Sequence, residues 1–158
     1  MKLIIADRGG HDIGKSTAIK NVFNELRSSY PDTTTLIEPQ DINELRYSWV
    51  DVKATIKIGN TLVGIESQGD PGTRMQKSVD DFINQGCEII LVACRNQGGT
   101  INKTTDLETN HGYTVLWLQN GKCTDNLCWK VLEDNYGYRV ADIIEKCALS
   151  KVLSPIYL

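Results

Sequence analysis

Gly9-Gly10-His11-Asp12-Ile13-Gly14-Lys15-Ser16 is the segment of this 158-residue chain that indicates its architecture most clearly. It fits the pattern G-x-x-x-x-G-K-[ST] at every defined position. A short apolar run, residues 2–6, precedes it and is typical of a buried strand. Apolar side chains recur at helical spacing after it, up to Leu26. The sequence therefore predicts a glycine-rich turn that joins a buried strand to an amphipathic helix.

The residue types in this turn suit the binding of a phosphate chain. Glycines let the backbone curl so that successive N–H groups point inward at anionic oxygens. The positive end of the following helix attracts the same anion. Lys15 supplies a mobile positive charge, and the Ser16 hydroxyl is a ligand that Mg²⁺ accepts. The alternative is an ordinary strand-to-helix turn with a surface lysine. We expect the Lys15 side chain to be solvated when no ligand is bound.

Through this motif the sequence resembles the P-loop (Walker A) NTPase superfamily over residues 2–20. The resemblance implies a core that binds ATP or GTP, with Lys15 acting in catalysis beside the β- and γ-phosphates and Ser16 on Mg²⁺. Thr17 resembles the position that often contacts the α-phosphate. The residues to which the resemblance assigns nucleotide binding are Gly9, Gly10, His11, Asp12, Ile13, Gly14, Lys15, Ser16 and Thr17.

A second motif, Leu62-Val63-Gly64-Ile65-Glu66-Ser67-Gln68-Gly69, is an apolar strand that ends in an acid. It resembles a Walker B segment, and its last four residues resemble the D-x-x-G element of GTPases with Glu in place of Asp. The resemblance implies that Glu66 holds Mg²⁺ and acts in catalysis, and that the Gly69 N–H contacts the γ-phosphate. Asp70 competes with Glu66 as the metal acid. A strand end followed by an ordinary tight turn is the alternative interpretation.

Three arginines and a Glu-Pro dipeptide complete the candidate residues. Arg8, Arg74 and Arg95 are possible sources of positive charge for phosphoryl transfer, in which one arginine can raise the rate strongly. Arg95 is the catalytic candidate among them, because it follows an internal strand and precedes a glycine-containing loop at the same edge of the sheet. Glu38-Pro39 resembles the Glu-Pro of thymidylate and deoxynucleoside kinases, in which the acid lies beside the phosphate acceptor.

The rest of the chain alternates strands with helices, which indicates an α/β fold. Residues 53–58 alternate polar and apolar side chains, so we expect a half-solvated edge strand in a hairpin with residues 61–65. Other strands are expected at 33–37, 88–93 and 113–118, and helices at 42–49, 75–83, 104–110, 127–132 and 140–148, the last two as separate closing stretches.

These elements predict one domain, residues 1–158, of the P-loop NTPase type. The expected architecture is a three-layer sandwich with a mostly parallel sheet and one antiparallel edge hairpin. Ligands bind beyond the carboxyl ends of the strands in such a sheet. We therefore expect the loops after Ala6, Glu66 and Cys94 to meet there.

Composition and charge argue against several classes of protein. The 17 Lys and Arg against 20 Asp and Glu give a net charge of −3 without a basic block, which argues against a nucleic-acid partner. No apolar run approaches the roughly 18 residues of a membrane span, and the N-terminal run is too short for a signal peptide. The five cysteines are an odd number without C-x-x-C spacing. They indicate reduced thiols and a cytoplasmic location.

Together these patterns predict the Mg²⁺-dependent binding and hydrolysis of a nucleoside triphosphate. ATP is favoured over GTP because the guanine-reading pattern N-K-x-D does not follow the late strand that ends at Leu118. One alternative is a small kinase that transfers the γ-phosphate to a nucleotide, nucleoside or other small-molecule acceptor. The other is a nucleotide-gated binding module with little turnover that acts through a protein partner.

Overall fold

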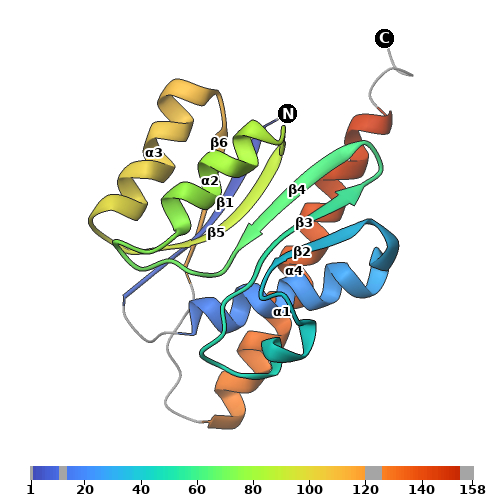
Figure 1. Ribbon diagram of the computed structural model, residues 1–158, viewed down its shortest axis with the longest axis vertical. Coiled ribbons are helices and arrows are strands. Elements are labelled where there is room, and N and C mark those ends of the chain that lie inside the picture. Colours follow the sequence, from blue (N-terminus) through green and yellow to red (C-terminus); the bar gives the residue numbers. More distant parts are fainter. Residues whose placement is uncertain (1, 11–13, 120–125, 154–158) are drawn as a thin grey trace.

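The strand that leads into the glycine-rich turn lies inside a six-stranded sheet (Figure 1). The computed structural model describes residues 2–10, 14–119 and 126–153, with the backbone alone for 126–134 and 151–153. The strands are β1 (Leu3–Arg8), β2 (Thr34–Glu38), β3 (Lys53–Ile58), β4 (Thr61–Glu66), β5 (Ile89–Cys94) and β6 (Thr114–Gln119). Their order is β2-β3-β4-β5-β1-β6, and β1 is parallel to both β5 and β6. The expected α/β fold with a mostly parallel sheet is confirmed.

The predicted hairpin of β3 and β4 is confirmed, but β3 is an internal strand, so the expectation that it is a half-solvated edge strand is wrong. β3 runs antiparallel to both β2 and β4, and β2 forms the edge of the sheet. The Lys53 end of the polar face of β3 contacts α2 (Met75–Asn84), where Lys53 Nζ lies 2.7 Å from Asp81 Oδ2. Lys57 is its only exposed residue. The alternating polarity therefore reflects a polar contact with a helix at Lys53 and contact with solvent at Lys57.

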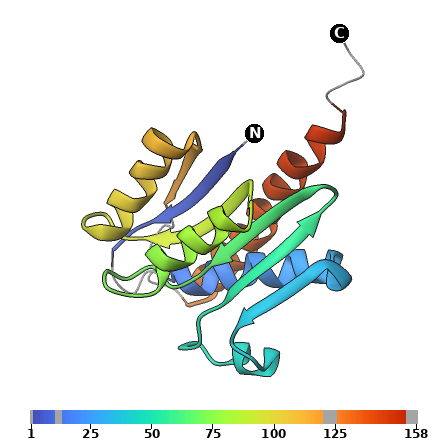
Figure 2. The ribbon, with the colours of Figure 1, turned by 45° about the horizontal axis from the view of Figure 1, so that its top comes forward.

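Helices cover both faces of the sheet (Figure 2). α1 (Lys15–Ser29) and α4 (Asn126–Leu153) pack on one face, and α2 and α3 (Gly99–His111) pack on the other. The neighbouring residues Ile4 and Ile5 of β1 belong to different apolar cores. This division follows from the period of two along a strand, which points successive side chains to opposite faces. The three layers form an α/β sandwich.

Three helices differ from their expected bounds. α4 is one continuous helix rather than two closing stretches. Gly137 lies where α4 meets α1, because a Cβ there would fall 2.8 Å from Asn21 Cβ. The interrupted apolar spacing near Gly137 thus marks a close contact between helices, not the end of one. α3 begins earlier than expected, at Gly99, and the short helix after Asp41 is the 3-10 helix η2 (Ile42–Arg46), which follows a shorter one, η1 (Pro31–Thr33).

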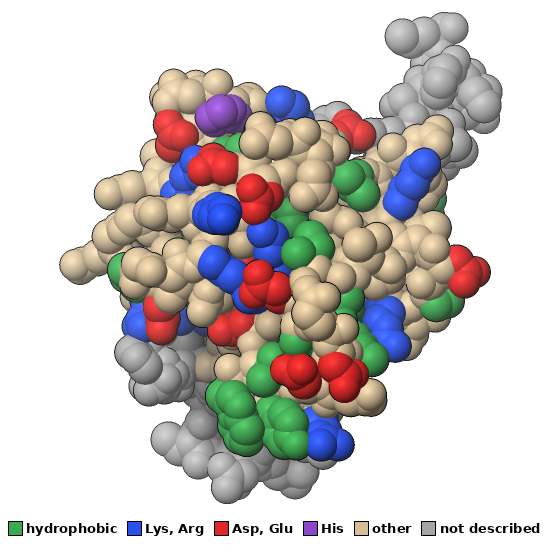
Figure 3. Space-filling view, viewed as in Figure 1, with side chains coloured by type: hydrophobic (Ala, Val, Ile, Leu, Met, Phe, Trp, Pro, Cys, Tyr) green, Lys and Arg blue, Asp and Glu red, His purple; other side chains and the backbone are tan. Residues whose placement is uncertain are grey.

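Acidic and basic side chains are interspersed on the face of the molecule that α2 and α3 form (Figure 3). An ion pair joins these two helices, with Lys103 Nζ 2.5 Å from Asp80 Oδ1. The described part of the chain contains no helix with the length and apolarity that a membrane span requires.

Candidate functional site

The loops after β1, β4 and β5 meet at one edge of the sheet, as predicted. The Gly9 N–H donates to Cys94 O at 3.2 Å, and Arg95 Nε donates to Asp70 Oδ1 at 2.8 Å. A cavity of about 260 Å³ lies between these loops and α1. The residues that line it are Gly14, Lys15, Ser16, Thr17, Asp51, Ser67, Gln68, Gly69, Asp70, Thr73 and Ala93.

The N-terminus of α1 opens into this cavity. Gly14 precedes the helix with a left-handed φ of 79°, a conformation that glycine adopts without strain, and as a glycine it has no side chain with which to cap the helix. The first N–H groups of a helix have no acceptor within it. Those of Lys15, Ser16 and Thr17 therefore add partial positive charge at the cavity, together with the helix dipole. An anion is the ligand that this helix end favours.

The structure brings most of the predicted nucleotide-binding residues to one place. Those that line the cavity are Gly14, Lys15, Ser16, Thr17 and Gly69. Gly9 and Gly10 follow β1, and their carbonyl oxygens contact Lys15. His11, Asp12 and Ile13 lie outside the described residues.

Lys15 is buried, so the expectation that its side chain is solvated without a ligand is wrong. Only 7% of the residue is exposed, and Nζ donates to Gly9 O at 3.2 Å and to Gly10 O. Burial lowers the pKa of Lys15, and the nearby charge of Arg95 lowers it further. Both effects disfavour the charged amine, and an arriving anion opposes them. The ammonium group is therefore held at the cavity by the carbonyl oxygens of the turn itself.

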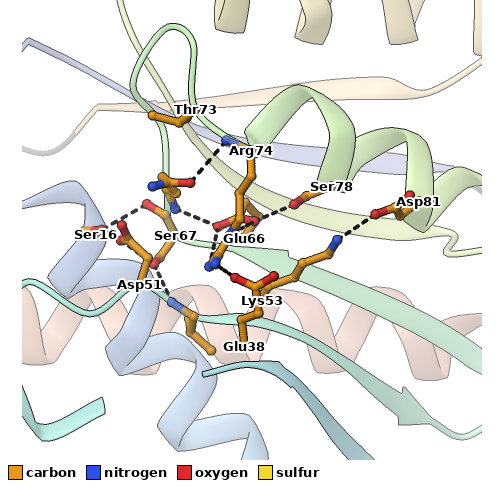
Figure 4. Close-up of polar contacts among 12 residues, drawn as sticks. Ser16, Glu38, Asp51, Lys53, Glu66, Ser67, Thr73, Arg74, Ser78 and Asp81 are labelled. Carbon is orange, nitrogen blue, oxygen red and sulfur yellow. Dashed lines mark hydrogen bonds and ion pairs between the residues drawn. The ribbon is translucent and has the colours of Figure 1, made fainter. Parts of the chain in front are cut away.

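The Ser16 hydroxyl belongs to a small polar cluster with Asp51 and Ser67 (Figure 4). Ser16 Oγ contacts Asp51 Oδ1 and donates to Ser67 O at 3.0 Å. Ser67 Oγ donates to the same Asp51 oxygen at 2.8 Å. The acid that the structure places beside the predicted metal ligand Ser16 is thus Asp51.

Asp51 was missed by the sequence analysis because it belongs to no motif. The hairpin contains the signal that could have found it. β3 pairs with β4 so that Lys53 lies opposite Glu66, which puts the residues before β3 beside the residues after β4. Two hydrogen bonds continue this pairing: the Ser67 N–H donates to Val52 O, and the Val52 N–H donates to Ser67 Oγ. Extending the predicted hairpin by two residues places Asp51 at the carboxyl edge.

Glu66 ends β4 as predicted, but its carboxylate lies with Arg74 and Ser78 rather than with Ser16 (Figure 4). It is fully buried and does not line the cavity. Burial raises the pKa of Glu66 to about 7, while hydrogen bonds from Ser78 and the Gln68 N–H act in the opposite direction. The Glu66 carboxylate, to which we assigned roles in holding the metal and in catalysis, thus already has hydrogen-bond partners within the protein.

The period of two along β4 explains this placement. Val63 and Ile65 pack in the core beneath α1 and α4, so Glu66 points to the opposite face, toward α2. Ser67 follows and again faces the side of α1. Arg74, one of the candidate arginines, lies over Glu66 and also contacts Glu38, the candidate acceptor-side acid.

Arg95 and Asp70 form an ion pair at the rim of the cavity. Arg95 Nη2 lies 2.6 Å from Asp70 Oδ1, and the Asp70 side chain remains about half exposed. Arg95 is close enough to lower the pKa of Lys15, whereas Asp70 acts to raise it. The catalytic candidate Arg95 is thus near the predicted phosphate site, and Asp70 neutralises part of its charge.

The polar cluster provides the kind of donor set that a hard divalent cation accepts. Mg²⁺ binds oxygen ligands, usually one or two carboxylates together with substrate phosphates. The hydroxyl of Ser16, the carboxylate of Asp51 and the carbonyl of Ser67 supply oxygens of these types. Within the described residues, no group of three or more His, Cys, Asp or Glu is placed to hold a metal. The residues therefore fit Mg²⁺ when phosphate oxygens complete its coordination.

Comparisons with known proteins were made by family model, by sequence and by structure. No family model, curated protein or solved structure matches the chain.

Proposed function

We propose that this chain binds ATP together with Mg²⁺ at the N-terminus of α1 and hydrolyses it. One observation carries the proposal: a helix N-terminus preceded by a left-handed glycine opens into a cavity beside a buried lysine amine. Backbone N–H groups, a helix dipole and an ammonium group all favour a polyanion at this position. The carboxyl edge of a mostly parallel sheet is also where ligands of such folds bind.

Lys15 is the main phosphate-binding side chain in this proposal. Its Nζ leaves the carbonyl oxygens of Gly9 and Gly10 and donates to phosphate oxygens, because a charged acceptor makes a stronger hydrogen bond than a neutral carbonyl. Arg95 supplies a second positive charge from the rim. When bound, Mg²⁺ neutralises charge on the phosphate oxygens. Ser16 provides one of its ligands.

A cytoplasmic location is part of the proposal, because ATP is abundant there and thiols stay reduced. The buried cysteines Cys87 and Cys94 are free thiols. Their pKa values are raised by burial to about 12 and about 11, so neither is a reactive thiolate at neutral pH.

Release of inorganic phosphate from ATP and GTP, with and without Mg²⁺, tests the proposal. We expect Mg²⁺-dependent turnover of ATP by the wild-type chain. Lys15→Ala should reduce the turnover on the order of 100-fold or more, because it removes charge stabilisation at the reacting phosphates. Exposed Lys146, whose Nζ lies 2.7 Å from Asp142 Oδ2 one helical turn away, gives the matched control Lys146→Ala.

The same assay with labelled ATP and a panel of metabolites separates the alternatives. A labelled organic product indicates a kinase, and free phosphate alone indicates a hydrolase. Tight nucleotide binding without turnover indicates a nucleotide-gated binding module. A folded wild-type chain that binds no nucleoside triphosphate contradicts all three.

A further inference from the structure

We propose that Asp51, and not Glu66, is the carboxylate that holds the divalent cation beside Ser16. This inference rests on the proposed function, since the cation binds together with a nucleotide. It goes beyond that function by assigning the metal site to a residue outside both sequence motifs. Four structural observations support it.

First, the hydrogen-bond capacity of Glu66 is already used. An ionised carboxylate has two oxygens and about four lone-pair sites. Oε1 accepts from the Gln68 N–H at 2.9 Å and from Arg74 Nη2 at 3.3 Å. Oε2 accepts from Ser78 Oγ at 2.6 Å and from Arg74 Nε at 2.9 Å. A cation at Glu66 must displace one of these donors inside a fully buried site, and Arg74 already neutralises the charge there.

Second, Asp51 has the capacity that Glu66 lacks. It lines the cavity, and its contacts with Ser16 and Ser67 both fall on Oδ1. Across the described part of the chain, Asp51 forms no ion pair within 4.0 Å, although its charge is near enough to raise the pKa of Lys20. Among the described residues no hydrogen bond falls on its second carboxylate oxygen, which leaves that oxygen to a cation.

Third, Asp70 is a weaker candidate for the same role. It lines the cavity, but Arg95 Nε and Nη2 both contact its Oδ1, at 2.8 and 2.6 Å. Its side chain is also about half exposed. A cation there would compete with a guanidinium group and with water.

Fourth, α1 fixes the segment that carries Asp51. Lys20 follows Ser16 by one helical turn, so both side chains project from the same face of α1. The buried Lys20 Nζ donates to Tyr47 O, Ser48 O and Val50 O at 3.1, 3.1 and 2.9 Å. Ser16 and Lys20 thus hold adjacent parts of one segment, which keeps the Asp51 carboxylate at the phosphate-binding helix.

Binding of Mn²⁺, followed by its electron paramagnetic resonance signal, tests this assignment without relying on turnover. The probe is Mn²⁺ with a non-hydrolysable ATP analogue. Asp51→Asn keeps a hydrogen-bond acceptor but removes the charge, and we expect it to weaken Mn²⁺ binding on the order of tenfold or more. Asp51→Glu restores the charge and should bind Mn²⁺ more tightly than Asp51→Asn. The exposed Asp32, on η1, provides the charge-matched control Asp32→Asn.

Two outcomes overturn the assignment: Asp51→Asn binds Mn²⁺ as tightly as the Asp32→Asn control, or Glu66→Gln loses at least as much Mn²⁺ affinity as Asp51→Asn. Circular dichroism establishes that each variant is folded. If Asp51→Asn does not fold, the Mn²⁺ affinity of Asp51→Glu is compared with that of the wild type instead. Nucleotide binding in EDTA separates this failure from failure of the proposed function. A wild-type chain that binds the analogue without metal retains the nucleotide-binding part of the proposed function even when the Asp51 assignment fails.

Discussion

Gly69 tests how tightly the loop after β4 packs against β5. A Cβ at Gly69 would lie 2.5 Å from Ala93 Cβ, 2.7 Å from Ala93 C and 2.8 Å from Ala93 O. Real Cβ atoms essentially never approach other atoms this closely. Ala93 is buried in β5 and pairs with Asp7 of β1, so its backbone has little room to move. The substitution Gly69→Ala must therefore displace the loop that lines the cavity.

Overpacking of this kind costs about 1–3 kcal/mol. Two of the three close contacts are with backbone atoms, so we expect a loss of about 2 kcal/mol in the free energy of unfolding. For a chain of this length, 1 kcal/mol corresponds to about 2–4 °C, so Tm should fall by about 4–8 °C. Gly10→Ala is the matched control, because among the described residues other than its chain neighbours its Cβ would meet no atom within 4 Å. We expect that control to lie within about 1 kcal/mol of the wild type.

Urea unfolding followed by circular dichroism measures this effect. In the double variant Gly69→Ala/Ala93→Gly the Cβ–Cβ contact is gone but both backbone contacts remain. The double variant should therefore recover only part of the loss, with a coupling energy of at least about 0.5 kcal/mol. If Gly69→Ala is as stable as the Gly10→Ala control, the close packing described above is wrong. Gly69 would then owe its identity to ligand binding alone.

Three further predictions concern the charged groups around the site. The pKa of Glu66 is raised from 4.5 to about 7, so the folded chain binds a proton more tightly than the unfolded chain. The free energy of unfolding should therefore fall as the pH rises from 4.5 to 7, by at most about 3 kcal/mol. Glu66→Gln should remove that fall, which urea titrations at several pH values measure. An equal pH dependence in both proteins would contradict this. Lys20→Met removes the donor from three backbone carbonyls and should lower the free energy of unfolding by about 1–3 kcal/mol, which a urea titration followed by circular dichroism measures. No loss of stability would show that water replaces the ammonium group without cost. Ser78→Ala removes the shortest hydrogen bond to Glu66 and should raise the Glu66 pKa further, measured by NMR titration; a lowered pKa would refute the sign.

The sequence predicted local structure well where one pattern has one physical cause. The apolar run before Gly9 and the helical spacing after Lys15 identified β1 and α1, because both elements bury apolar side chains on known faces. Parallel order then brought three loops to one edge, and the structure agrees. The candidate phosphate-binding turn followed from these local signals alone.

Other features depend on contacts between distant segments, which local patterns do not contain. The alternation in β3 is the same whether Lys53 meets water or Asp81, so it could not place β3 inside the sheet. The acid that ends β4 was identified, but the face to which Glu66 points depends on which side of the sheet α1 occupies. Asp51 joins the site through a hairpin register, and no motif marks that relationship.

Isothermal titration calorimetry of ATP into the wild-type chain and into Lys15→Ala, each with Mg²⁺, shows whether the chain binds ATP through Lys15. We expect saturable binding at one site per chain for the wild type and loss of that binding in Lys15→Ala, which remains folded. ATP binding of equal strength by both proteins, or none by the folded wild type, would contradict this expectation.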